Sequence, residues 1–257
     1  MTVAAEDGML RRLGQSIGVA TRERMIRTAI AMLRENLPSE RQALRLVDVG
    51  CNDGRKTIRL AEGIGLSVRN LLGLELAPDL RQRAAALFSV LSADFECEAL
   101  PIESASMDVV ICDQVFEHLK NVHWLMDEIY RVLRPHGYFL VGVPNLAAWH
   151  NRLLLTLGRQ PLCIGIFTAH VRAFTPPALR ALVCFQGRMT TVEQRGSGFY
   201  PLPPSPVTDF LGGRLSTLAP YLYLLARKGA GNNEGALQRM YEESGRIEHA
   251  EHGWIWC

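Results

Sequence analysis

The feature that most constrains the fold is an alternation of short apolar runs and helical patterns between residues 44 and 143. Apolar runs of strand length occupy 44–50, 70–76, 107–113 and 137–143. Patterns with helical spacing occupy 55–63, 78–88 and 123–133. Apolar runs without polar alternation are typical of strands that are buried on both faces of a parallel sheet. The alternation therefore predicts an α/β domain with a mostly parallel sheet.

Further elements are expected on both sides of this core. A helix is expected over 20–36, ended by Pro38, and another over 176–185, which begins with two prolines. Strands are expected over 188–196 and 220–228, with a loop rich in glycine and proline over 196–214 between them. The predicted organisation is an N-terminal helical segment (1–43), one domain (44–228) and a C-terminal tail (229–257).

Composition excludes several classes of protein. With 257 residues, 48% of them hydrophobic, the chain can bury one sizeable core. The net charge of +2 is too small to indicate nucleic acid or an anionic membrane as partner. The six cysteines contain no CxxC pair, so we expect free thiols and no metal site. No apolar run approaches the roughly 20 residues of a membrane span, and the start lacks an apolar signal segment, so we expect a cytoplasmic protein.

The most informative segment is VDVGCNDG, residues 47–54, at the first strand-to-helix junction. Glycines in such a turn let the backbone approach a ligand closely and adopt a positive φ. Glu75 follows Gly54 by 21 positions and ends the next strand, where a carboxylate can accept both hydroxyls of a ribose. Asp94 follows a further short apolar stretch, and Asp113 ends the strand of 107–113. The spacing predicts a nucleoside-binding site.

In order and spacing these motifs resemble the class I S-adenosylmethionine-dependent methyltransferases. The resemblance covers 44–228 and is carried by VDVGCNDG, GLELAPD, ADFECEALPIESASMDVVICDQVFEHL and YRVLRPHGYFLVGVPN. It implies a Rossmann-like, mostly parallel seven-stranded sheet with helices on both faces. It also implies S-adenosylmethionine as the cofactor and methyl transfer as the activity.

The resemblance further implies which residues bind the cofactor. They are Asp48, Gly50, Cys51, Asn52, Gly54, Glu75, Leu76, Asp94, Phe95 and Asp113. Of these, Gly50, Cys51, Asn52 and Gly54 would wrap the methionine portion. Glu75 would bind the ribose diol, and Leu76 would lie against the adenine. The adenine amino group would donate to Asp94, the Phe95 amide would meet a ring nitrogen, and Asp113 would lie beside the amino-acid end.

Two positions depart from the family pattern. Asn52 stands where glycine is commonest, although asparagine tolerates left-handed backbone better than most residues. His136 replaces the first glycine of the usual Pro-Gly-Gly turn. The competing interpretation is a Rossmann domain that binds NAD, but the turn lacks GxGxxG because residue 57 is Thr. A sulfonium cofactor has no pyrophosphate to seat on a helix N-terminus, so the missing glycine favours methyl transfer.

Two histidines are candidate general bases for a hydroxyl acceptor. His118 follows Glu117 at the carboxyl edge of the sheet, where it either shapes the floor of the active site or only packs and caps. His170 lies in a His-x-Arg-x-Phe-Thr segment that resembles family members acting on glycans, lipids and secondary metabolites. There Arg172 either clamps an anion or hydroxyl of the substrate or, with Thr175, pins the loop to the next helix.

The acceptor is expected to be a small molecule or a saccharide, methylated at oxygen. Residues 143–161 resemble the inserted helix that covers the substrate site in the same subset, so Asn145, Trp149 and His150 are expected to line that site. The alternatives are methylation of RNA or protein, or a domain that binds the cofactor or a partner without turnover. Nucleic acid is not expected, because the arginines at 11, 12, 22, 24, 27 and 34 have no aromatic neighbours and suit a solvated helix face. The tail, which ends in WIWC, is expected to fold against its own domain.

Overall fold

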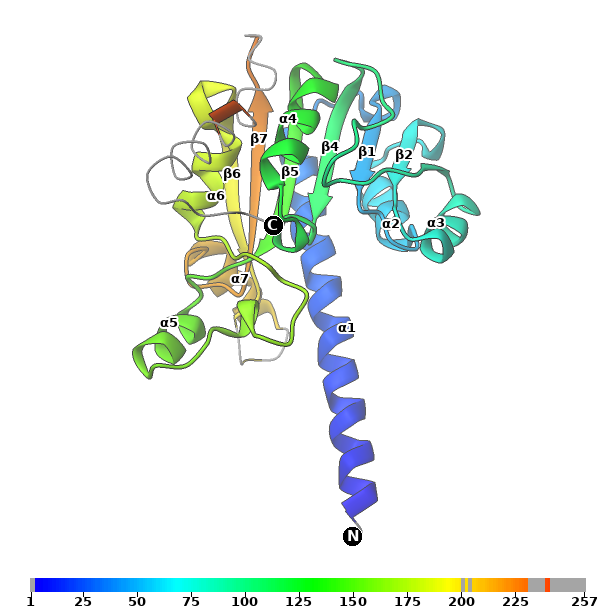
Figure 1. Cartoon of the computed structure of the whole chain (residues 1–257). Helices are drawn as coiled ribbons and strands as arrows, with labels where there is room; N and C mark the ends of the chain where they lie inside the picture. The colour runs from blue at the N-terminus through cyan, green and yellow to red at the C-terminus, as the bar shows by residue number, and fades with distance from the viewer. Residues whose placement is uncertain (1–2, 200–201, 203–204, 231–238, 241–257) are drawn as a thin grey trace.

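In the computed structural model seven strands form one sheet in the order β3-β2-β1-β4-β5-β7-β6 (Figure 1). The structure describes residues 3–199, 202, 205–230, 239 and 240, with side chains from residue 19 onward. The strands are β1 (Leu46–Val49), β2 (Leu71–Leu74), β3 (Ser89–Leu91), β4 (Met107–Asp113), β5 (Leu133–Pro144), β6 (Met189–Ser197) and β7 (Tyr221–Lys228). Neighbours are parallel except where β7 pairs with β5 and β6. The mostly parallel seven-stranded sheet predicted from the sequence is confirmed.

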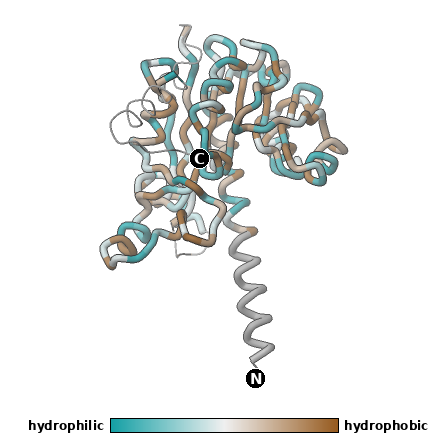
Figure 2. The backbone as a smooth tube through the Cα atoms, viewed as in Figure 1, coloured by the Kyte–Doolittle hydropathy of each residue, from teal (hydrophilic) through white to brown (hydrophobic). Residues whose placement is uncertain are grey.

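Helices cover both faces of this sheet. They are α1 (Val3–Asn36), α2 (Arg55–Ile64), α3 (Pro78–Ala85), α4 (Val122–Val132), α5 (Trp149–Thr156), α6 (Pro176–Val183) and α7 (Pro206–Arg214). The helices pack on the sheet through two buried hydrophobic clusters. Leu33 of α1 and Leu60 of α2 belong to one cluster, and Ile129 of α4 and Leu179 of α6 belong to the other. Hydrophobic residues are accordingly concentrated along the inner strands (Figure 2). The N-terminal segment therefore packs on the domain through α1.

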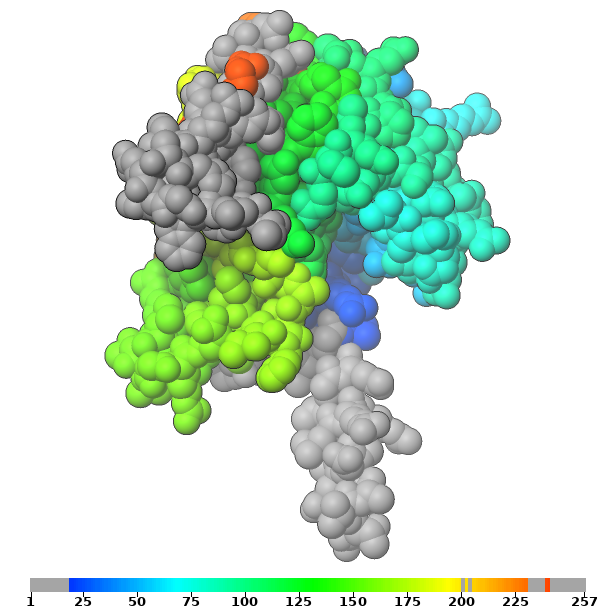
Figure 3. All heavy atoms as spheres, viewed as in Figure 1, coloured from blue at the N-terminus to red at the C-terminus, as the bar shows by residue number. Residues whose placement is uncertain are grey.

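The order of winding places a ligand-binding edge at the carboxyl ends of β1 and β4. From β1 the chain winds outward to β2 and β3, and it returns to the other side of β1 with β4. Open α/β sheets bind ligands where the winding direction reverses, outside the carboxyl ends of the strands. Figure 3 shows this edge as a recess, with blue residues of α1 visible between the cyan part around α3 and the yellow-green residues that precede α6.

The segment between β6 and β7 differs from the prediction, because residues 206–214 form α7 and not a loop. Ser205 begins the helix: its Oγ accepts from the Thr208 backbone N–H, and the Thr208 Oγ1 accepts from the Ser205 N–H at 2.9 Å. The glycines that suggested a loop serve packing. A Cβ on Gly212 would lie 2.6 Å from the carbonyl oxygen of Gly198, so only glycine allows this close approach.

The prediction that the arginines of α1 form a solvated face is wrong for Arg24. Its side chain is buried, donates to Thr208 Oγ1 at 2.7 Å and pairs with Asp209. Both partners lie on α7, the helix that the sequence pattern missed. Arg22, Arg27 and Arg34 are exposed, as expected.

Two expectations concern the ends of the chain. The predicted N-terminal helix begins at Val3 instead of residue 20. The tryptophans of the tail lie outside the described residues. Among the helices that the structure describes, none is long and apolar enough to cross a membrane.

Candidate active site

The turn between β1 and α2 follows a path that its glycines permit. Gly50, Asn52 and Gly54 have φ values of 75°, 55° and 79°. The left-handed conformation of Asn52 agrees with its place at a glycine position in the family pattern. A Cβ on Gly50 would lie 2.5 Å from Cγ2 of Val115. The glycine turn therefore packs directly against the segment that follows β4.

Glu75 is held at the end of β2 by the backbone. Its Oε2 accepts from the Asn52 N–H at 2.9 Å, and its Oε1 accepts from the Ala77 N–H at 3.0 Å. A carboxylate has about four acceptor sites, so each oxygen keeps one for a further donor. Leu76, next to it, is 50% exposed and offers an apolar surface. This geometry suits the predicted binding of a ribose diol by Glu75 and of an adenine ring by Leu76.

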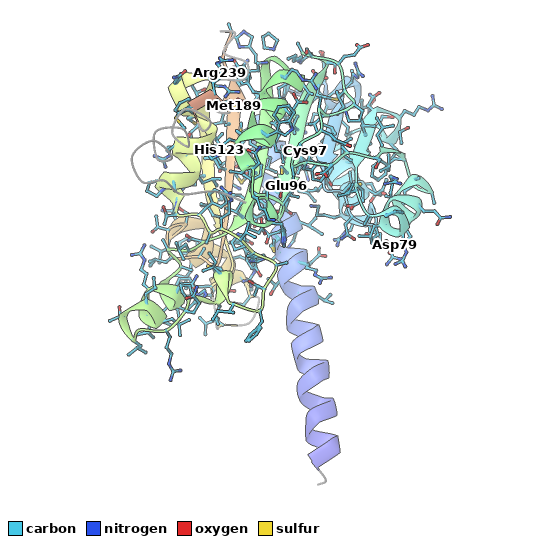
Figure 4. The ribbon with its side chains drawn as sticks, viewed as in Figure 1. Asp79, Glu96, Cys97, His123, Met189 and Arg239 are labelled. Carbon is cyan, nitrogen blue, oxygen red and sulfur yellow. The ribbon has the colours of Figure 1, made fainter. Side chains whose placement is uncertain are left out.

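The segment after β3 is fixed by its own carboxylates. Asp94 Oδ1 accepts from the Glu96 N–H at 2.9 Å. Glu96, labelled in Figure 4, accepts from the backbone N–H groups of Lys120 and Asn121, each at 2.8 Å. The Phe95 side chain is buried. These bonds join the segment of Asp94 to the segment that follows β4.

Three charged side chains lie beneath the glycine turn. Asp48 is wholly buried and accepts from Thr57 Oγ1 at 2.6 Å, and Lys56 Nζ lies 3.4 Å from Asp113 Oδ2. Burial raises the pKa of Asp48, while Lys56 opposes the rise. Burial lowers the pKa of Lys56, but the carboxylates of Asp48 and Asp113 outweigh this effect and hold that pKa above its ordinary value. The site thus presents an ammonium group and carboxylates, which match the two charged groups of an amino acid.

The structure of this region differs from the sequence prediction at Lys56 and at the side chain of Cys51. Lys56 was not predicted as a site residue, although it lies in the first turn of α2 and is one of three lysines in the chain. Cys51, predicted in the cofactor site, is buried with its side chain in the core cluster of α1 and α2. Burial raises the pKa of its thiol to about 12, so it is a neutral packing group at physiological pH.

A short 3-10 turn after β4, Phe116–His118, brings Glu117 and His118 beside His170. One donor atom of each of these three side chains lies within 4.8 Å of the others. The imidazole rings of His118 and His170 meet edge to face with their centroids 4.8 Å apart. Glu117 is 1% exposed, and burial raises its pKa to about 8. The two histidines proposed separately from the sequence therefore form one cluster, with Glu117 as its third member.

The loop that carries His170 is docked on the same turn by main-chain and arginine bonds. The Val171 N–H donates to the Glu117 carbonyl oxygen at 2.8 Å. Arg172 Nε donates to the Leu119 carbonyl oxygen at 2.8 Å, and Arg172 Nη2 donates to the Lys120 carbonyl oxygen. These contacts pin the loop to the segment that follows β4, whereas the sequence prediction had Arg172 and Thr175 pin it to the next helix, α6.

Comparison with known proteins decides the family of this site. The family model described as a methyltransferase domain matches residues 47–141, which include the glycine turn, Glu75 and the turn after β4. Residues 47–141 of the chain therefore belong to a methyltransferase domain. A relative in Mycolicibacterium smegmatis is named a probable S-adenosylmethionine-dependent methyltransferase, which agrees with the cofactor that the sequence motifs imply.

Relatives of this methyltransferase domain include enzymes that are named for O-methylation. The ubiquinone biosynthesis O-methyltransferase of Paracidovorax citrulli is 25% identical over 177 residues, which are 63% of this chain and 69% of that protein. The malonyl-[acyl-carrier protein] O-methyltransferase of Hahella chejuensis is 27% identical over 51% of this chain and 41% of its own. An S-adenosylmethionine-dependent methyltransferase structure from Mesorhizobium loti superposes with a TM-score of 0.53 at 18% identity, over 77% of this chain and 96% of that one.

These matches differ in how much of each relative they cover. The curated relatives are matched over 18% to 69% of their own length. The first of these spans only 46 residues, at 52% identity. The likeness in sequence thus concerns the methyltransferase domain and not whole chains.

The expected acceptor-binding residues lie where β5 and α5 meet. Asn145 is wholly buried, and its amide donates to the Ala219 carbonyl oxygen at 2.8 Å and accepts from the Ala147 N–H at 2.9 Å. The role that this geometry supports for Asn145 is to fix loops of the methyltransferase domain. Trp149 and His150 begin α5, and both are half-buried.

Proposed function

We propose that the methyltransferase domain transfers the methyl group of S-adenosylmethionine to an oxygen atom of a small-molecule or saccharide acceptor. The observation that supports this most strongly is the cluster of Glu117, His118 and His170 at the carboxyl edge of the sheet. A neutral imidazole can accept the proton that an acceptor hydroxyl must lose, and Glu117 can do so above its pKa of about 8. Three relatives carry O-methyltransferase in their names.

In this proposal the cofactor lies along the carboxyl edge from β3 to β4. Glu75 would accept from the ribose hydroxyls, Leu76 would support the adenine, and Asp94 would accept from the adenine amino group. The glycine turn would hold the methionine portion, with Asp113 binding its ammonium group and Lys56 its carboxylate. The 3.4 Å contact between Lys56 and Asp113 shows that the two charges already lie side by side.

The chemical step is one displacement at carbon. The acceptor oxygen forms a bond to the methyl carbon, the S–CH3 bond breaks, and its electron pair remains on sulfur. The acceptor proton passes to the cluster, and the products are a methyl ether and S-adenosylhomocysteine. Because alignment of oxygen, carbon and sulfur supplies much of the rate, a docked loop that fixes His170 serves catalysis as well as binding.

The acceptor side of this proposed site is formed by α5 and the segment before α6. The ring of Trp149 stacks on that of Phe199, with centroids 6.4 Å apart and planes inclined by 18°. Aromatic faces of this kind bind flat or ring-shaped apolar surfaces, such as a phenol or the face of a sugar. They support a ring-shaped acceptor that carries a hydroxyl group.

A transfer assay tests this proposal. The purified full chain is incubated with methyl-labelled S-adenosylmethionine and a panel of phenols and saccharides, and products are identified by mass spectrometry. We expect label on an oxygen atom of one acceptor class, together with S-adenosylhomocysteine in equal amount. Label that enters only RNA or protein, or a methyl group found on nitrogen, would contradict the proposed acceptor.

A further inference from the structure

We infer that Glu117, His118 and His170 bind a divalent transition-metal cation at the carboxyl edge of the sheet. One donor atom from each side chain lies within 4.8 Å of the other two. Two imidazoles and one carboxylate form a ligand set that proteins use for Zn²⁺ and Fe²⁺. The sequence pattern did not predict a metal site, because the cysteines lack the spacing of metal ligands.

Each of the two histidines has one ring nitrogen hydrogen-bonded to a backbone carbonyl oxygen, as histidines that bind metals do. His118 Nδ1 lies 3.2 Å from the Ala169 carbonyl oxygen, and His170 Nδ1 lies 2.8 Å from the Cys163 carbonyl oxygen. A carbonyl oxygen only accepts, so each Nδ1 carries the proton and each Nε2 keeps its lone pair. Histidines that ligate metals almost always donate their other N–H to a carbonyl or carboxylate in this way.

Glu117 provides the second, independent observation. Its side chain is 1% exposed, and neither carboxylate oxygen accepts a hydrogen bond from another residue in the described part of the chain. A buried carboxylate without such bonds is costly unless a cation compensates it. Lys56, the cation near it, is paired with Asp113. A metal ion between Glu117 and the two imidazoles would supply the charge that this side chain lacks.

The position of the cluster allows an ion to enter and to bind substrate. Tetrahedral ligand atoms about 2.1 Å from an ion lie about 3.4 Å apart, so donor atoms within 4.8 Å of one another need to move inward by about 1 Å or less. The hydrogen bond from the Val171 N–H to the Glu117 carbonyl oxygen already holds the two segments together. His118 is exposed, which opens the cluster to solvent. Three protein ligands leave at least one coordination position for an oxygen atom.

This inference deepens the proposed function and rests on it for its catalytic meaning. An acceptor hydroxyl that binds the ion becomes more acidic, because a divalent cation lowers the pKa of a bound O–H group. Its proton then passes to a water molecule, and the oxygen attacks the methyl carbon as the S–CH3 bond breaks. The histidines act as ligands in this state, and the cation takes over the activation of the oxygen.

Direct metal binding tests the inference without methyl transfer. The full chain, without an affinity tag, is treated with a chelator and titrated with Zn²⁺ in a calorimeter. We expect one ion per chain, and an affinity at least about tenfold weaker in Glu117→Gln and in His170→Ala. His136→Asn is the matched control: it removes an exposed histidine at the opposite edge of the sheet, and asparagine tolerates its φ of 65°. It should bind Zn²⁺ as the unchanged chain does.

A second measurement does not depend on the folding of variants. Co²⁺ added to the unchanged chain should give the visible absorption of a site with nitrogen and oxygen ligands, and Zn²⁺ should displace it. The inference is overturned if the unchanged chain binds less than one equivalent of Zn²⁺ while still binding S-adenosylhomocysteine. It is also overturned if both cluster variants bind Zn²⁺ as tightly as the control. Failure to bind S-adenosylhomocysteine would instead reject the proposed function.

Discussion

The substitution Gly50→Ala tests how the glycine turn is built. At a φ of 75° an alanine costs about 1–2 kcal/mol, because its Cβ crowds the neighbouring carbonyl oxygen. The same Cβ would lie 2.5 Å from Cγ2 of the buried Val115, and separating the two groups adds about 1–3 kcal/mol. We therefore expect Gly50→Ala to lower the free energy of unfolding by about 2–5 kcal/mol.

Gly65→Ala is the matched control for this experiment. Gly65 ends α2 with the same φ of 75°, and a Cβ there meets no atom within 4 Å. This variant has the backbone cost alone, so we expect a loss of about 1–2 kcal/mol. The difference between the two variants measures the contact between the glycine turn and Val115.

Urea unfolding followed by tryptophan fluorescence gives both free energies, and calorimetry gives the affinity for S-adenosylhomocysteine. We expect that affinity to fall at least about tenfold in Gly50→Ala, a change of about 1.4 kcal/mol, and to be unchanged in Gly65→Ala. Equal destabilisation of the two variants with unchanged affinity would refute the reasoning. The turn would then neither pack on the segment after β4 nor shape the cofactor site.

Three further substitutions test other parts of the account. Glu75→Ala should weaken S-adenosylmethionine binding by about 1–3 kcal/mol through loss of charge-assisted hydrogen bonds, and unchanged affinity in calorimetry would reject its ribose role. His170→Ala should lower turnover by about 10²–10⁴-fold with cofactor affinity intact, and normal turnover would exclude His170 from activation of the acceptor. Arg24→Ala should cost about 1–3 kcal/mol in urea unfolding, whereas Arg27→Ala, at an arginine whose side chain is 58% exposed, should cost less than about 1 kcal/mol. Equal losses would show that the buried contacts of Arg24 with α7 contribute nothing beyond those of a surface pair.

Local patterns predicted the parts of the molecule that depend on neighbours in sequence. The predicted strand 107–113 is β4 with the same bounds, because the consecutive apolar residues 109–112 suit a strand that is buried on both faces. The left-handed turn at Gly50 and Gly54 followed from glycine alone. The residues that these patterns predict for the cofactor lie together at the carboxyl ends of β1, β2 and β4, and their role in binding stays a prediction.

Features that depend on distant segments could not be predicted in the same way. Residues 206–214 were expected to be a loop because of their glycines, yet Gly212 is small so that the helix can lie against Gly198. The burial of Arg24 follows from that helix. His118 and His170 were each proposed alone, and only the docking of the second loop on Glu117 brings them together.

The measurement that tests the central claim most directly is a crystal structure of the chain with S-adenosylhomocysteine. The account predicts one molecule per chain at the carboxyl edge of β1, β2 and β4, with both ribose hydroxyls within hydrogen-bonding distance of the Glu75 carboxylate. The sulfur atom should face the cluster of Glu117, His118 and His170. A molecule bound elsewhere, or a ribose that makes no contact with Glu75, would contradict it.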